Sequence, residues 1–68
     1  MSFVELTAAN GAKVSVNPET VVLITDAADA EGRTILGNSM VFFIGAPPMP
    51  ISAPRTDVQE LLEGGVVL

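Results

Sequence analysis

Two arginines are the residues of this chain that are best suited to binding a ligand. Arg33 and Arg55 are the only guanidinium groups, and together with Lys13 they face eight carboxylates, so the formal net charge is −5. A guanidinium forms paired hydrogen bonds with phosphate or carboxylate groups. In a symmetric oligomer each arginine is repeated, so copies of Arg33 or Arg55 could converge on an anionic ligand such as a nucleotide at a subunit interface. Pairing with the chain's own carboxylates is the alternative.

Two other segments contain residues of the types found in binding motifs, but their spacing does not fit those motifs. Asp26, Asp29 and Glu31 precede Gly32, whereas a calcium loop needs oxygen ligands at alternating positions and a distal bidentate Glu. We therefore expect an exposed acidic loop without a metal ion. The run Pro47–Pro50 fits polyproline recognition only loosely, and we interpret it as a stiff linker.

The composition excludes most enzyme chemistry. The chain has no Cys and no His, which removes catalytic thiols, Ser-His-Asp triads, thiolate or imidazole metal sites and haem ligation. Glu5 is the one acid inside a predicted strand and a weak candidate for acid–base work. Three cationic side chains are too few to bind a nucleic-acid backbone. We expect a non-enzymatic protein without a cofactor and without direct nucleic-acid binding.

The apolar segments predict a chain that neither crosses nor enters a membrane. The longest apolar run, residues 40–46, is too short to span a bilayer. The first residues lack the basic and apolar regions of a signal peptide. We therefore expect a cytoplasmic protein.

The first half of the chain predicts a hairpin. Apolar and polar residues alternate in residues 3–7 and 13–17, which is typical of half-buried strands. Asn10-Gly11 lies between them and is a strong hairpin signal. Asn17-Pro18 predicts a turn, because the residue before a proline is driven out of the helical region and Asn can cap the bend.

The second half predicts more strands and one helix. We expect strands at 21–25, 33–36 and 39–44, a tight turn at Gly37-Asn38, an extended loop at 46–50 and an edge strand at 51–53. The helix is expected at about 56–63, with Thr56 as N-cap and Gly64-Gly65 ending it. We therefore predict a single domain over residues 1–68 with a mainly β fold. It is a small antiparallel barrel or curved sheet of five or six short strands, closed by the helix.

Two predicted strands carry more apolar surface than one copy of the chain can cover. Residues 21–24 and 40–44 are apolar on both faces, and the helix stripe of Val58, Leu61 and Leu62 is too small to cover both. We predict a homo-oligomer in which a second copy covers them. The predicted interface residues are Val22, Ile24, Val41 and Phe43. A monomer whose outer face is covered by the proline-rich segment and the C-terminal tail is the alternative.

The order of short motifs resembles that of a known family. The motifs are 3–7 ending in Leu-Thr, Asn10-Gly11, the Val-Asn pair at 16–17, Thr34-Ile35, Ile51, and Val58 followed by Leu61-Leu62. They are similar to the FlbD/SwrD-type family of small bacterial proteins associated with flagella and swarming, some of them phage-borne. The resemblance implies a fold and a non-enzymatic role, with no catalytic motif. The sequence differs from the family at residues 46–55, which hold four of the five prolines, and in a longer acidic loop.

Two functions follow from these observations. The first is a small oligomeric interaction protein that binds another macromolecule, with a protein as the expected partner, in a bacterial or phage accessory or regulatory role. The alternative is a protein that binds a small anionic ligand through Arg33 or Arg55 at a subunit interface.

Overall fold

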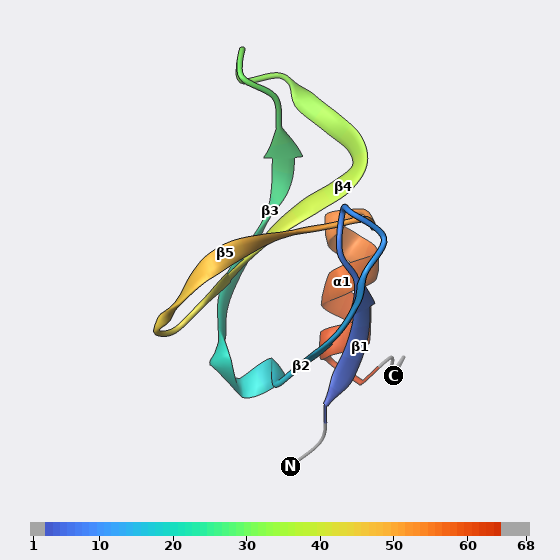
Figure 1. Ribbon diagram of the computed structural model, residues 1–68, viewed down its shortest axis with the longest axis vertical. Coiled ribbons are helices and arrows are strands. Elements are labelled where there is room, and N and C mark those ends of the chain that lie inside the picture. Colours follow the sequence, from blue (N-terminus) through green and yellow to red (C-terminus); the bar gives the residue numbers. More distant parts are fainter. Residues whose placement is uncertain (1–2, 65–68) are drawn as a thin grey trace.

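The computed structural model describes residues 3–64, and within them the fold is mainly β (Figure 1). The elements are β1 (Val4–Thr7), β2 (Lys13–Val16), the 3-10 helix η1 (Pro18–Thr20), β3 (Val21–Ala28), β4 (Thr34–Phe43), β5 (Ala46–Ile51) and α1 (Arg55–Leu62). The strands form two antiparallel sheets, β1-β2 and β3-β4-β5. The prediction of a mainly β fold with one helix is confirmed, but these residues form no closed barrel.

The first hairpin is confirmed, with a three-residue loop rather than a two-residue turn. The backbone N–H of Ala8 donates to the carbonyl of Ala12 at 2.7 Å, and the N–H of Gly11 donates to the carbonyl of Ala8 at 2.8 Å. Gly11 alone takes a positive φ, of 92°, as the third residue of such a loop requires. Asn10 contributes a side-chain hydrogen bond, accepting from the N–H of Ala12 at 2.9 Å.

The predicted turn at Asn17-Pro18 is also confirmed. Asn17 caps η1 by accepting from the backbone N–H of Glu19 at 3.0 Å, while the Thr20 hydroxyl donates to the Asn17 carbonyl at 2.8 Å. This turn directs the chain from β2 into β3.

The prediction of a tight turn at Gly37-Asn38 is wrong. Both residues lie inside β4, which is one strand of ten residues. Asp26 pairs with Ser39 and Ala28 with Thr34, so Ala27 alone lies opposite residues 35–38. These four residues form a bulge that bows β4 outward in the projecting β3–β4 hairpin (Figure 1), and Gly37 permits it with a φ of 81°. We call residues Ile35–Asn38 the arch.

The prediction that the prolines at 46–50 stay outside a ladder is also wrong, because β5 pairs with β4 along this segment. The carbonyl of Pro50 accepts from the N–H of Ala9, on the side away from β4. The missing N–H of Pro50 points to that same side, so the β4–β5 ladder loses no donor there. The adjacent pair Ala8–Ile51 forms a single bridge, and it connects the two sheets.

Helix α1 begins one residue earlier than expected and is capped differently. Pro54 occupies the N-cap position and no side chain caps the helix, so Thr56 lies inside the first turn. The backbone N–H of Val58 donates to the carbonyl of Pro54 at 3.1 Å. Gly64 has a positive φ just after the helix, as predicted, whereas Gly65 lies outside the described residues.

The core lies between the two sheets and the helix. Its fully buried members come from both halves of the chain: Leu6, Val16, Val41, Ile51 and Val58. Burial of this cluster supplies the main force that holds α1 against the strands, since apolar surface is removed from water. The fold thereby fixes which face of β3-β4-β5 remains outside.

Candidate functional site

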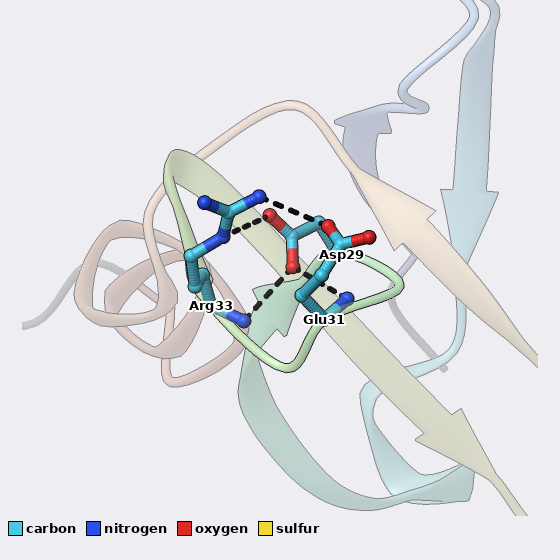
Figure 2. Close-up of polar contacts among 3 residues, drawn as sticks. All are labelled: Asp29, Glu31 and Arg33. Atoms are coloured by element: carbon cyan, nitrogen blue, oxygen red, sulfur yellow. Dashed lines mark hydrogen bonds and ion pairs between the residues drawn. The ribbon is translucent and has the colours of Figure 1, made fainter.

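Arg33 is held by carboxylates of its own loop (Figure 2). Its Nε lies 3.1 Å from Asp29 Oδ2, and one terminal nitrogen lies 2.9 Å from Glu31 Oε1. Asp29 Oδ1 also accepts from the backbone N–H groups of Glu31 and Arg33, at 3.0 and 2.9 Å. The predicted acidic loop is therefore a compact turn organised around Asp29, and its arginine is shared by two carboxylates.

Arg55 is paired elsewhere. As the first residue of α1, it donates from Nε to Asp26 Oδ1 in β3 at 3.2 Å. Among residues 3–64 the two arginines share no carboxylate, since Arg33 pairs with Asp29 and Glu31 and Arg55 pairs with Asp26. Each of the two predicted ligand-binding residues is therefore already occupied by carboxylates of its own chain.

The outer face of the three-stranded sheet is mostly apolar, although Thr25 also lies on it, opposite Met40. Leu23 pairs with Phe42, and Met40 pairs with Pro50, so these side chains share one face. Ile44 follows Phe42 by two positions, on the same side of the chain, and is 69% exposed. We call this surface the outer strip; its residues are Leu23, Met40, Phe42, Ile44 and Pro50.

The four predicted interface residues are distributed differently. Val22 is 60% exposed, beside a register shift in β3. Val41 is fully buried, and Ile24 and Phe43 are partly buried against the same core. The shift at Val22 leaves two consecutive residues of β3 exposed and moves its alternation by one position. Of the four predicted interface residues, Val22 is therefore exposed, whereas Val41 is a core residue and not a surface residue as predicted.

An apolar pocket opens between β2 and the β4–β5 hairpin. Its volume is about 300 Å³, at the lower end of the range of about 300–1,000 Å³ found for ligand pockets. Its walls are Val14, Ser15, Val16, Asn17, Thr20, Phe43, Ala46, Pro47 and Met49. None of these side chains is charged. Sequence reasoning missed the pocket, because its two walls come from segments that are far apart in the chain.

Three further acidic side chains form a separate surface. Asp57, Glu60 and Glu63 are exposed on or directly after α1, and among residues 3–64 none of them is in an ion pair. Residues three apart are neighbours on a helix, so their charges lie on one side of α1. We call Asp57, Glu60 and Glu63 the acidic helix face.

Two further features are absent from the part of the chain that the structure describes. Residues 3–64 contain no group of three or more Asp, Glu, His or Cys side chains that could hold a metal ion. In the same residues, no helix has the length and apolarity needed to cross a membrane. The sequence matches no protein-family model and no curated protein, and the fold matches no solved structure.

Proposed function

We propose that this chain is a non-enzymatic interaction protein that self-associates through the outer strip and binds a second macromolecule through its acidic helix face. The observation that carries the proposal is the exposure of large apolar side chains in β3, at Val22 and Leu23, and directly after β4, at Ile44. Leu23 is 47% exposed and lies opposite Phe42, and Ile44 is bonded through its N–H to the carbonyl of Thr20 at 2.8 Å. A contiguous apolar patch of this kind is typical of an interaction site.

Charge favours a second copy as the molecule that covers the outer strip. The chain has a net charge of −5, yet residues 34–54 contain no charged side chain, and neither do residues 20–25. Two copies can therefore bring their outer strips together without burying a charge, which would cost several kcal/mol in a dry interface. The acidic side chains then remain at the surface.

The acidic helix face is available to the second partner. Three carboxylates and no cation lie on residues 57–63, so this surface attracts a basic protein surface and repels the phosphates of a nucleic acid. A bacterial or phage accessory role is consistent with this arrangement. It is also the kind of role that the sequence resemblance to the FlbD/SwrD-type family implies.

The anion-binding alternative has no observation in its favour. Arg33 is neutralised by two carboxylates and Arg55 by one. A phosphate would have to displace a carboxylate from either arginine in a chain that is already negative.

Light scattering tests the self-association. At micromolar concentration we expect a mass of at least twice the 7.0 kDa of one chain. Leu23→Glu places a charge in the outer strip and should lower that mass. Leu61→Glu is the matched control, since Leu61 is equally exposed, at 46%, on α1. An unchanged mass for Leu23→Glu would reject the outer strip as the interface.

A further inference from the structure

Leu36 projects from the arch with no support from its own chain. It is 90% exposed, the largest exposure among the large apolar residues in the described part of the chain. Ile35 beside it is also exposed, and Gly37 holds the backbone in the bulge that presents both side chains.

The pocket between β2 and the β4–β5 hairpin is complementary to Leu36 in size and polarity. It is lined by apolar groups of Val16, Phe43 and Met49 and by no charged side chain, and its volume of about 300 Å³ has room for a branched four-carbon side chain and part of a neighbour. Leu36 cannot reach the pocket of its own chain. The β3–β4 hairpin and η1 lie toward opposite ends of a molecule that is 38 Å long (Figure 1).

The charges around the two features permit contact between copies. The loop next to the arch carries Asp29, Glu31 and Arg33, a net charge of −1, and the arch itself carries none. Lys13 and Glu19 flank the pocket residues in sequence and cancel each other. Both regions are thus nearly neutral, whereas residues 57–63 carry three negative charges. Two like-charged copies can therefore meet through the arch of one and the pocket of the other with little repulsion.

We propose that Leu36 of one copy inserts into the Val16–Phe43–Met49 pocket of the next, in a head-to-tail contact separate from the outer strip. This inference extends the proposed self-association. We call the Leu36 side chain the knob. Because the knob and the pocket are different surfaces, the contact is heterologous. A dimer formed in this way retains one unused knob and one unused pocket, so further copies can add until a ring closes.

Complementary variants test the contact in the Leu23→Glu background, where the outer strip is disrupted. We expect this background to retain association that increases with concentration. Adding Leu36→Asp removes the knob, and adding Ala46→Glu places a charge in the pocket. Each should give a chain of 7.0 kDa by light scattering. An equimolar mixture of the two should form a species of twice that mass, because one chain still has a pocket and the other still has a knob. Leu61→Asp is the control for an added charge and should leave the association intact.

The outcomes separate this inference from the proposed function. If Leu23→Glu alone is already a single chain at every concentration, or if Leu36→Asp leaves the association unchanged, the head-to-tail contact is rejected while the outer strip stands. If the mixture of Leu36→Asp and Ala46→Glu stays at 7.0 kDa, the knob does not enter the pocket. If Leu36→Asp dissociates the protein but Ala46→Glu does not, Leu36 binds elsewhere. If the unmodified protein is itself a single chain, the proposed function fails as well. Circular dichroism of each variant establishes that the fold is retained.

Discussion

Arg55 and Asp26, which lie 29 positions apart in the sequence, are joined by a hydrogen bond of 3.2 Å between Nε and Oδ1. The contact connects the first residue of α1 to β3. Arg55, which the sequence suggested as a residue that binds an anionic ligand, is thus bonded to a carboxylate of its own chain. Both side chains are largely exposed, at 43% and 55%, so the pair contributes about 0–1 kcal/mol to stability. Its role is to orient the start of a helix that has no capping side chain.

Packing of α1 depends on Val58. This side chain is fully buried in the cluster with Val41 and Ile51. Val58→Ala removes two buried carbons and leaves a cavity, which we expect to lower the free energy of unfolding by roughly 1–3 kcal/mol. Urea denaturation followed by circular dichroism measures the change. Leu61→Ala on the exposed side of the same helix should change it by less than about 0.5 kcal/mol. Equal losses in both variants would contradict the assignment of Val58 to the core.

The arch depends on Gly37. Its φ of 81° is unfavourable for other residues, while a Cβ at this position would meet no atom within 4 Å. Gly37→Ala should therefore destabilise the chain through backbone strain alone, by about 1–2 kcal/mol. Gly37→Asn should cost less, because Asn tolerates the left-handed region. A thermal melt compares the two variants, and an alanine variant as stable as the unmodified chain would show that the bulge is not formed.

The turn between β3 and β4 depends on Asp29 more than on Arg33. Asp29 Oδ1 accepts two backbone N–H groups in addition to the ion pair of Oδ2, so Asp29→Ala should cost about 1–2 kcal/mol. Asp29→Asn keeps the Oδ1 acceptor and should cost less than half as much. Arg33→Gln removes only exposed ion pairs and should cost less than about 1 kcal/mol. If Arg33→Gln proves the most harmful in urea denaturation, this ranking is wrong.

The hydroxyl of Ser39 is buried without a hydrogen-bond partner. Such a group loses its bonds to water and gains none in return. Ser39→Ala should therefore raise the free energy of unfolding, by an amount on the order of 1 kcal/mol. Ser52→Ala, at an exposed position, is the control and should have little effect. A loss of stability in Ser39→Ala would reveal a bond that the hydroxyl makes in solution.

Local sequence signals predicted the local structure well. Alternation and Asn10-Gly11 gave the first hairpin, Asn17-Pro18 gave the turn, and the spacing of Val58, Leu61 and Leu62 gave the helix. The errors arose where tertiary pairing overrides local preference. Gly37-Asn38 has the composition of a turn, yet Ser39 and Thr34 both pair with β3, so the glycine serves a bulge.

Long-range relationships were beyond the reach of the sequence. A proline such as Pro50 is excluded from a ladder only when its missing N–H faces the neighbouring strand, and that direction depends on the register. The register shift at Val22 likewise decided which residues of β3 and β4 point outward. The charge balance and the apolar surplus were visible from the beginning, but the pocket and the arch were not.

The mass of the unmodified protein in solution is the most direct measurement of the central claim, which is that the apolar surface of β3 and β4 is covered by further copies of the chain. Light scattering across micromolar concentrations should give a mass of at least twice 7.0 kDa, increasing with concentration. A constant mass of 7.0 kDa over that range would contradict self-association through either surface.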